Sequence, residues 1–172
     1  DVIEDCAQSF GASIENKKTG IIGKTGIFSF YATKLITSGG QGGLFVSKDK
    51  GLVDKVKDYR EFDSRRDNKQ RFNFQMTDIQ AAVGRVQLKQ LPFFLERRHE
   101  IFQMYKDSGL DILESKNNKS VYYRAVIRVQ NPSKVRDKLI NKEIKTIIPI
   151  EDWELLGDGK NYKNSYNLTQ TT

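Results

Sequence analysis

The sequence contains a single cysteine, Cys6, and a single histidine, His99, among its 172 residues. One cysteine excludes an internal disulfide framework and any metal site built from several cysteines, and it is typical of a reducing compartment, here the cytoplasm. One histidine leaves little for a histidine-rich metal centre or a Ser-His-Asp triad, so we expect no bound metal. The apolar runs are far shorter than the ~18 residues of a membrane-spanning helix, and we expect no membrane partner.

Charged residues are abundant, but the two signs are mixed along the chain. Lysine and arginine number 29 against 22 aspartate and glutamate, which gives a net charge of +7. An excess of this sign suits an anionic partner such as nucleic acid, a membrane surface or a phosphorylated small molecule. The positive charges are interleaved with acidic residues, and no helix-turn-helix, zinc-finger or RNP motif is present, so we expect no nucleic-acid partner.

Hydrophobic periodicity predicts alternating strands and helices, with a smaller α+β region in the last third of the chain. We expect strands over residues 1–5, 26–31, 44–46, 121–129 and 146–150. We expect helices over residues 49–59, 79–91 and 93–107 and a short one from residue 131, with the charged residues 57–71 in a loop. Thr77 or Asp78 is the expected cap of the helix over 79–91, and Pro92 is expected to break or restart it.

Asp5 stands at the end of the first apolar strand and is followed by small and polar residues. A carboxylate at the carboxyl end of a strand is a common position for a site residue in an α/β sheet. Aspartate is also favoured as a helix N-cap, and the spacing alone favours that structural role.

Lys34 follows the aromatic strand 26–31 and precedes the glycine-rich segment 39–43. Desolvation at such a point frees the amine of a lysine to act as a nucleophile. Long charged side chains also commonly extend toward water at strand ends, and position alone favours that interpretation. The glycine-rich segment does not complete a dinucleotide-binding motif, and by itself it indicates a flexible turn between strands.

Seven segments of the chain follow one another in an order that is diagnostic when they are taken together. They are Val-Ile-Glu-Asp-Cys-Ala-Gln-Ser-Phe-Gly (2–11), Phe-Ser-Phe-Tyr-Ala-Thr-Lys (28–34), Gly-Gly-Gln-Gly-Gly (39–43), Asn-Phe-Gln-Met-Thr-Asp-Ile-Gln-Ala-Ala (73–82), Gln-Leu-Lys (87–89), Glu-Arg-Arg (96–98) and Tyr105. In this order they closely resemble the DegT/DnrJ/EryC1/StrS family, whose members are pyridoxal-phosphate-dependent aminotransferases acting on nucleotide-linked keto sugars. The resemblance covers nearly the whole chain and is most specific up to about residue 105.

The resemblance implies a catalytic role for Lys34, which matches the lysine that forms a Schiff base with the cofactor and then moves the α-proton as a general base. Some relatives that carry histidine at this position are dehydratases, so a lysine here favours transamination. Asp5 matches the carboxylate that pairs with the pyridine nitrogen of the cofactor. By keeping that nitrogen protonated, the carboxylate makes the ring an electron sink.

Four further residues match cofactor-binding positions of the family. Gln8 matches the residue near the phenolic oxygen of the ring, and Ala7 matches the small residue against which the ring lies flat. Ser29 matches a hydroxyl donor to the cofactor phosphate. Asn73 resembles an asparagine that reaches the phosphate of the neighbouring subunit's cofactor, which implies a homodimer with active sites at its interface.

Two positions depart from the family pattern. Lys24 and Thr25 stand in a turn where the family often has an aspartate. Phe74 and Gln75 replace the usual Tyr-Arg after the asparagine, so this chain lacks the arginine of that motif. Neither departure concerns Asp5 or the lysine.

The expected fold is therefore α/β, the aspartate-aminotransferase-like fold type I of pyridoxal-phosphate-dependent transferases. Residues 1–92 would form the second half of the large cofactor domain, and residues 93–172 most of a small C-terminal α+β domain that is incomplete at its end. Because the chain opens on a core strand, we expect an N-terminal part to precede it. The expected reaction transfers an amino group, from glutamate, to a keto group of a nucleotide-linked deoxy sugar in polysaccharide or glycan synthesis.

Two alternatives stay open at this point. The chain could be a non-catalytic fragment or interaction module of such an enzyme, because the Gly-Thr phosphate loop and the stacking aromatic ring of the family's first half are not found in it. A basic nucleic-acid-binding module is the weaker alternative. Salt-dependent binding to DNA would separate that module from the other two interpretations.

Overall fold

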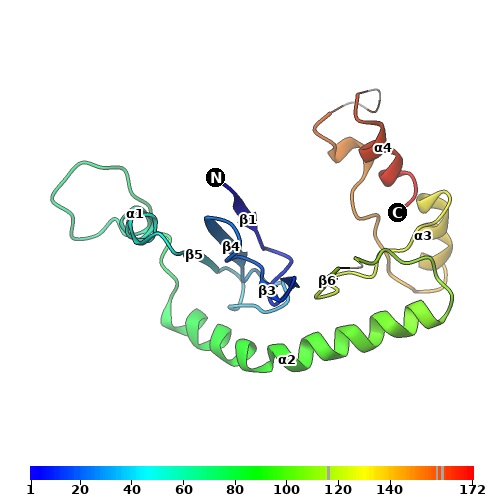
Figure 1. The fold of residues 1–172 in the computed structure, drawn as a ribbon, viewed down its shortest axis with the longest axis horizontal. Helices are drawn as coiled ribbons and strands as arrows, with labels where there is room; N and C mark the ends of the chain where they lie inside the picture. The colour runs from blue at the N-terminus through cyan, green and yellow to red at the C-terminus, as the bar shows by residue number, and fades with distance from the viewer. Residues whose placement is uncertain (116, 158, 160) are drawn as a thin grey trace. The chain divides into compact units, whose positions relative to one another are not determined.

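The computed structural model describes residues 1–115, 117–157, 159 and 161–172 (Figure 1). The chain divides into two compact units. The first contains Asp1–Glu100 and Ser115–Tyr123, and the second contains Ile101–Glu114 and Arg124–Thr172. The long helix α2 (Asp78–Asp107) begins in the first unit and ends in the second.

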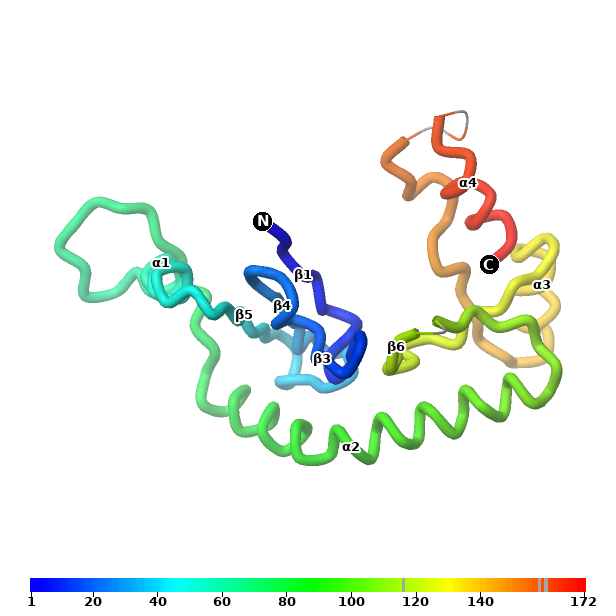
Figure 2. The backbone as a smooth tube through the Cα atoms, in the orientation of Figure 1, coloured from blue at the N-terminus to red at the C-terminus, as the bar shows by residue number. Residues whose placement is uncertain are grey.

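The first unit contains a three-stranded sheet in the order β1-β4-β5 (Figure 2). Its strands are β1 (Ile3–Asp5), β4 (Thr25–Ser29) and β5 (Gly43–Ser47). β1 and β4 are parallel, with Asp5 opposite Ile27, whereas β4 and β5 are antiparallel. The strands expected near residues 1–5, 26–31 and 44–46 are therefore confirmed, with small shifts of their ends.

Apolar side chains anchor the segments that leave this sheet. Cys6, directly after β1, is a free thiol that is only 3% exposed, so it acts as a small buried side chain. The rings of Phe10 and Phe28 meet edge-on with 5.0 Å between their centroids, a preferred aromatic geometry. Leu35 and Ile36, which follow β4, are 7% and 3% exposed. Buried side chains thus hold the backbone in both segments that leave this sheet, the one after β1 and the one after β4.

A second sheet of the first unit has the order β3-β2-β6 and antiparallel pairing. Its two-residue strands are β2 (Ser13–Ile14), β3 (Lys17–Lys18) and β6 (Asn118–Lys119). β6 brings a segment distant in sequence onto the first unit, where Val121 is 5% exposed. The expectation of a strand over 121–129 is wrong, because Tyr122 has a φ of 45°, a left-handed conformation that ends extended structure.

Helix α1 (Lys50–Arg60) confirms the helix expected over residues 49–59. The side chain of Asp49 caps it by accepting a hydrogen bond from the Leu52 N–H at 3.2 Å. Residues 61–77 then form a loop that Arg71 holds together, since its guanidinium donates to Asp58 at 3.0 Å and to Asp67 at 2.6 Å. The hydrogen bond from Arg71 is the largest cause that holds the pKa of the Asp67 carboxyl well below its usual value.

Helix α2 starts at a capping box. The hydroxyl of Thr77 accepts a hydrogen bond from the Gln80 N–H at 3.3 Å, and the Gln80 side-chain oxygen accepts one from the Thr77 N–H at 3.0 Å. The expected break at Pro92 is wrong, because this residue lies inside one continuous helix. A proline removes one backbone hydrogen bond, yet the helix continues through Pro92, beside Leu91, which is 9% exposed.

In the part of the chain that the structure describes, the second unit contains three short helical elements and the C-terminal end of α2. Helix α3 (Pro132–Ile140) is capped by Asn131, which confirms the short helix expected from residue 131. The strand expected over 146–150 is wrong: within the described residues of this unit, strand pairing is limited to an isolated bridge between Ile112 and Ile127. Pro149 offers no N–H to a ladder there. The 3-10 helix η1 (Asp152–Glu154) and helix α4 (Lys163–Thr169) follow.

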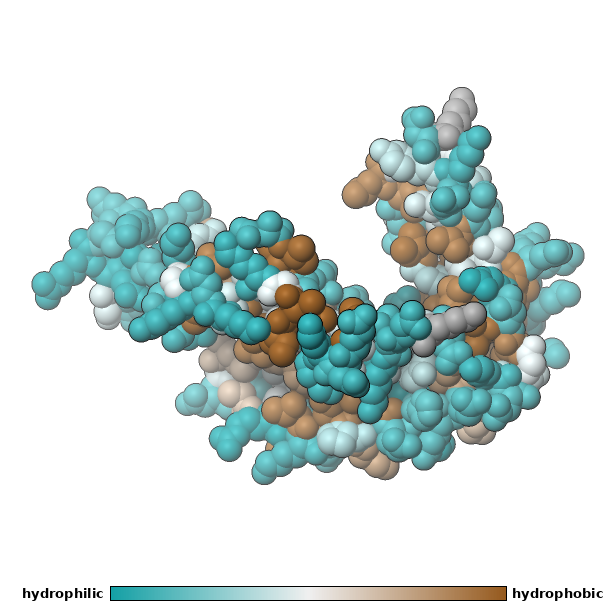
Figure 3. Space-filling model, viewed as in Figure 1, coloured by the Kyte–Doolittle hydropathy of each residue, from teal (hydrophilic) through white to brown (hydrophobic). Residues whose placement is uncertain are grey.

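Large apolar side chains remain on the surface of the first unit (Figure 3). Ile3 on β1 is 70% exposed, and Ile79 and Phe93 on α2 are 79% and 68% exposed. Contiguous exposed apolar surface is a feature of protein or membrane interaction sites and of ligand-binding grooves. None of the described helices combines the length and apolar character that crossing a membrane requires.

Candidate active site

The candidate site lies at the carboxyl ends of two parallel strands. Asp5 is the last residue of β1 and Ser29 the last residue of β4. Because the strands run in parallel, with Asp5 opposite Ile27, both residues lie at the same edge of the sheet. The Cys6 N–H donates to the Ile27 carbonyl at 2.8 Å, which extends the pairing one step beyond Asp5. Ligands of open α/β sheets bind outside this carboxyl edge.

The carboxylate of Asp5 is exposed, and one of its oxygens accepts a hydrogen bond from the Ala7 N–H at 3.0 Å. This bond closes a tight turn, and no helix follows in the described residues 6–12, so the role of helix N-cap is wrong. Ala7 is half-buried and Gln8 exposed, directly beyond the strand. A carboxylate with one oxygen so engaged keeps capacity to accept a further hydrogen bond.

Ser29 and Lys34 belong to one well-anchored segment. The hydroxyl oxygen of Ser29 accepts a hydrogen bond from the Tyr31 N–H at 3.3 Å and keeps its own proton for donation. The backbone N–H of Lys34 donates to the Tyr31 carbonyl at 2.9 Å. The side chain of Lys34 is half-buried, and its Nζ lies 5.8 Å from the centroid of the Tyr123 ring.

The glycine-rich segment 39–43 lies against this lysine-bearing segment. The Phe30 N–H donates to the Gly42 carbonyl at 2.8 Å, and the Ala32 N–H donates to the Gly40 carbonyl at 3.2 Å. Gly39 and Gly40 have φ values of 80° and 130°, which only glycine adopts without strain. The segment is thus a turn between β4 and β5, as expected, and it is bonded to the backbone just before Lys34.

Glu4, which the sequence reasoning did not single out, binds the loop that leads into β4. Its carboxylate accepts hydrogen bonds at 2.7 Å from the N–H groups of Gly20, Ile22 and Gly23. Partial desolvation raises the pKa of Glu4, but the three hydrogen bonds outweigh it and leave that pKa below its usual value. All three partners are backbone N–H groups, so the sequence carries no side-chain signal for this contact.

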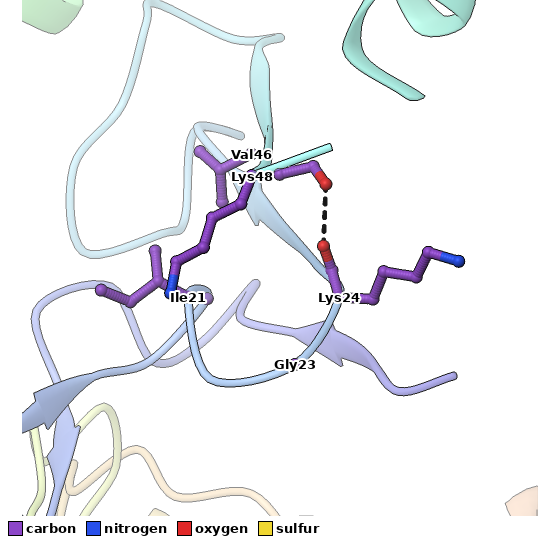
Figure 4. Close-up of a pocket in the computed structure, with 7 residues that line it drawn as sticks. Ile21, Gly23, Lys24, Val46 and Lys48 are labelled. Atoms are coloured by element: carbon purple, nitrogen blue, oxygen red, sulfur yellow. Dashed lines mark hydrogen bonds between the residues drawn. The ribbon is translucent and has the colours of Figure 1, made fainter. Parts of the chain in front are cut away.

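A small hollow of about 80 Å³ lies beside this loop (Figure 4). It is lined by Gly20, Ile21, Gly23, Lys24, Val46, Ser47 and Lys48, and the Ser47 hydroxyl closes it by donating to the Lys24 carbonyl at 2.8 Å. The hollow lies at the amino end of β4, whereas Asp5 and Ser29 stand at the carboxyl ends. It is therefore separate from the candidate site.

Asn73 lies in the loop after α1 rather than on the β1–β4 edge. Its neighbours Phe72 and Phe74 donate backbone hydrogen bonds to the Tyr59 carbonyl at 2.9 Å and the Arg60 carbonyl at 3.2 Å. The rings of Phe72 and Phe74 stack with 5.0 Å between centroids, and the side chain of Asn73 is exposed. The loop is thus tied to the end of α1 and presents Asn73 to solvent.

The chemical groups at the sheet edge suit pyridoxal phosphate. Lys34 offers an amine for the aldehyde, Asp5 an exposed carboxylate for the ring nitrogen, and Ser29 a hydroxyl for the phosphate. The small side chain of Ala7 leaves room beside the strand end, and Gln8 offers an amide. The described residues therefore fit this cofactor by their donor and acceptor types.

Both the structure and the sequence of this chain are similar to those of known aminotransferases. The structure matches that of a DegT/DnrJ/EryC1/StrS aminotransferase from Brucella abortus with a TM-score of 0.85 and 25% identity, over 98% of this chain and 50% of that one. The fold is therefore that of the type I aminotransferases, as expected. The family model described as the DegT/DnrJ/EryC1/StrS aminotransferase family matches residues 1–168. The chain belongs to this family, whose aminotransferases depend on pyridoxal phosphate.

Several curated relatives have functional names, of which two illustrate the range. A GDP-perosamine synthase of Escherichia coli O157:H7 is 33% identical over 158 residues, which is 84% of this chain and 43% of the relative. A UDP-4-amino-4,6-dideoxy-N-acetyl-beta-L-altrosamine transaminase of Helicobacter pylori is 33% identical over 110 residues, which is 60% of this chain and 29% of the relative. The chain thus spans less than half the length of these relatives.

Two residues near Lys34 were missed by the sequence reasoning. The hydroxyl of Tyr123 donates to the Thr33 carbonyl at 3.1 Å, and the Arg98 guanidinium donates to the carbonyls of Tyr122 and Tyr123 at 3.1 Å each. Arg98 belongs to a segment that matched the family, but nothing in its sequence context pointed to the site. These contacts depend on the tertiary fold.

Proposed function

We propose that this chain is the lysine-bearing part of a pyridoxal-phosphate-dependent aminotransferase. The reaction would move an amino group, from glutamate, to a keto group of a nucleotide-linked deoxy sugar. The observation that carries this proposal is that Ser29 ends β4 at the same sheet edge where Asp5 ends β1, with Lys34 in the segment that directly follows β4. Family membership over residues 1–168 supports it.

Lys34 carries the covalent and proton-transfer chemistry in this proposal. When bound, pyridoxal phosphate supplies an electron sink for the negative charge that develops on carbon during amino transfer. The Nζ of Lys34 would hold the cofactor through its amine. Once the amino donor displaces it, the same amine would take and return the proton at the donor's α-carbon.

The other residues at the edge would orient the cofactor. Asp5 would hold a proton on the ring nitrogen, and its bond to the Ala7 N–H at 3.0 Å fixes the direction of the carboxylate. Ala7 would lie beneath the ring, and the Gln8 amide would donate to the phenolic oxygen. Ser29 would donate its hydroxyl proton to the phosphate.

We also propose a homodimer in which Asn73 of one protomer reaches the cofactor phosphate of its partner. The exposed position of Asn73 supports this role, as does the 64% exposure of the stacked Phe74 beside it. Exposed aromatic side chains are enriched where protein surfaces meet. Sedimentation velocity on the full chain should show a dimer. Phe74→Ser, which removes the exposed ring, should shift the equilibrium toward monomer.

The proposed substrate class is supported by the names of two relatives, a GDP-perosamine synthase and a UDP-linked amino sugar transaminase. A net charge of +7 suits an anionic diphosphate. The product would feed polysaccharide or glycan synthesis. The free thiol of Cys6 suits a reducing compartment, and we place the reaction in the cytoplasm.

We further propose that residues 1–92 correspond to the second half of the large cofactor domain and residues 93–172 to most of the small domain. The match to 50% of the Brucella abortus aminotransferase supports the view that the cofactor domain is present only in part, as do the exposed Ile3 and Ile79. A non-catalytic role for the chain is the outcome to expect if the full chain binds no cofactor.

A coupled assay tests the proposed reaction. The full chain is incubated with pyridoxal phosphate, L-glutamate and a GDP- or UDP-linked keto sugar, and 2-oxoglutarate and the amino sugar are measured together. Equal yields of both products are expected, and Lys34→Ala should form neither. 2-Oxoglutarate without amino sugar from all keto sugars offered would contradict the assigned acceptor class.

A further inference from the structure

Tyr123 reaches the lysine of the candidate site from the segment after β6. Its hydroxyl donates to the Thr33 carbonyl at 3.1 Å across 90 positions of sequence. Its ring lies 5.8 Å, centroid to atom, from the Nζ of Lys34. Both contacts lie inside the first compact unit, so they belong to one packed body.

The hydrogen bond from Tyr123 completes the bonding of one particular peptide group. The carbonyl of Thr33 and the N–H of Lys34 belong to the same planar unit. Tyr123 donates to that carbonyl at 3.1 Å, and that N–H donates to the Tyr31 carbonyl at 2.9 Å. Because both polar groups of the plane are bonded, rotation of the plane is opposed from both sides. The direction in which the Lys34 side chain leaves the backbone is thereby set.

The ring of Tyr123 acts on the other end of the same side chain. An ammonium group within about 6 Å of an aromatic centroid is attracted by the negative face of the ring. At 5.8 Å, the Nζ of Lys34 is at the outer limit of that range. The ring thus biases the amine toward one of the positions that a flexible four-carbon stem can reach.

The backbone of Tyr123 is itself held from helix α2. One nitrogen of the half-buried Arg98 guanidinium donates to the carbonyls of both Tyr122 and Tyr123 at 3.1 Å. Val121, immediately before them, is 5% exposed, and the ring of Tyr122 lies 5.6 Å from that of His99. Tyr123 is therefore supported by α2 and by buried neighbours.

We propose that Tyr123, held by Arg98, is a positioning residue that fixes the backbone and the amine of Lys34 for its reaction with the cofactor. The proposal rests on the proposed function, because it assigns a purpose to the contact between these two residues. A nucleophile that starts from one fixed position avoids the cost of being ordered at each turnover. Tyr123 contributes no proton and no bond to the reaction.

A first experiment tests the contact without cofactor. The full chain is reductively ¹³C-methylated, and the Lys34 dimethylammonium signal is assigned by its loss in Lys34→Arg. Ring current from Tyr123 should shift this signal upfield in the wild type and in Tyr123→Phe, and the shift should vanish in Tyr123→Leu. Tyr122→Leu is the matched control, since that neighbouring ring lies against His99, and it should leave the signal unchanged.

A second experiment measures the consequence for reactivity. The rate of the borohydride-trapped pyridoxyl adduct at Lys34 is followed by peptide mapping, with adducts at the surface residue Lys48 as the internal reference. Tyr123→Leu should slow the Lys34 adduct roughly three- to tenfold, because a ring contact and a hydrogen bond are both lost. Tyr123→Phe, which keeps the ring, should slow it about two- to threefold. Tyr122→Leu should match the wild type.

The outcomes separate the two proposals. Identical Lys34 signals in wild type and Tyr123→Leu, or identical adduct rates, would overturn the positioning role while leaving the proposed function standing. A normal upfield shift with no Lys34 adduct in any variant would contradict the proposed function, and with it the purpose assigned to Tyr123. If Tyr123→Leu fails to fold, Tyr123→Phe alone decides the matter through its adduct rate.

Discussion

Asp5 on β1 stands opposite Ile27 on β4 in a parallel register, two residues before Ser29. This register places the end of one strand beside the end of the other, and it gives the site its carboxylate and its hydroxyl. A slip of one residue would turn the side chain of Asp5 to the other face of the sheet. The arrangement of Asp5 and Ser29 therefore depends on the register of these two short strands.

Asp5→Asn separates the charge of this residue from its structural role. The asparagine carbonyl can still accept the Ala7 N–H, which Asp5 accepts at 3.0 Å, so the turn should form and stability should change little. The loss of the negative charge beside the ring nitrogen should lower the amino-transfer rate by roughly 10²-fold or more. To check this, kcat and the thermal melting temperature are measured for Asp5→Asn and for the wild type. A variant that melts like the wild type and keeps full kcat would contradict the role of Asp5.

Glu4→Gln tests the contact between β1 and the loop before β4. One amide nitrogen would face an N–H where a carboxylate oxygen now accepts at 2.7 Å, so the variant should lose roughly 1–2 kcal/mol of stability at pH 7. Urea unfolding of the wild type and of Glu4→Gln measures this difference in the free energy of unfolding. Glu4→Ala, which leaves all three N–H groups without this acceptor, should be destabilised more than Glu4→Gln.

The same contact has a definite pH dependence. The pKa of folded Glu4 lies below its usual value, so the stability it contributes is fully present above the unfolded pKa of about 4.3. This contribution is lost as the pH falls through the folded pKa. The difference in stability between wild type and Glu4→Gln should be constant near pH 7 and shrink below about pH 4. A difference that grows on acidification would contradict this assignment.

Gly20→Ala and Gly39→Ala form a matched pair. Both glycines have positive φ values, 91° and 80°. A methyl group on Gly20 would overlap the Phe28 ring, which Phe10 holds edge-on, whereas one on Gly39 would have no atom within 4 Å. Gly20→Ala should therefore be less stable than Gly39→Ala by roughly 1–3 kcal/mol, measured by urea unfolding. Equal losses would show that the loop moves freely away from β4.

The sequence predicted the starts of helices, which depend on residues close together in the chain. Thr77 caps α2 as its side chain predicted, and Asp49 and Asn131 cap the two helices that were expected to begin there. Pro92 was expected to break or restart a helix, but α2 runs through it without interruption, with the buried Leu91 beside it. The strand expected from residue 121 does not form, because Tyr122 has a left-handed backbone conformation. No local sequence pattern predicted that conformation.

In the candidate site, too, the sequence predicted individual residues but not the contacts between distant segments. Asp5 and Lys34 could be singled out from their positions at strand ends and from the family resemblance. The contact of Lys34 with Tyr123 could not, because the hydrogen bond to Thr33 joins residues 90 positions apart. The role of Glu4 was equally hidden, since its three partners are backbone groups that carry no side-chain signature.

Mapping the pyridoxyl adduct to single residues decides whether Lys34 is the residue that binds the cofactor. The full chain is mixed with pyridoxal phosphate, scanned for a visible absorption band, reduced with borohydride and digested for peptide mapping. The assignment of Lys34 predicts one dominant adduct, on this residue. In Lys34→Ala the band should disappear and the amino-transfer activity should fall at least about 10³-fold. No adduct on Lys34, or the same band and activity in Lys34→Ala, would contradict the assignment.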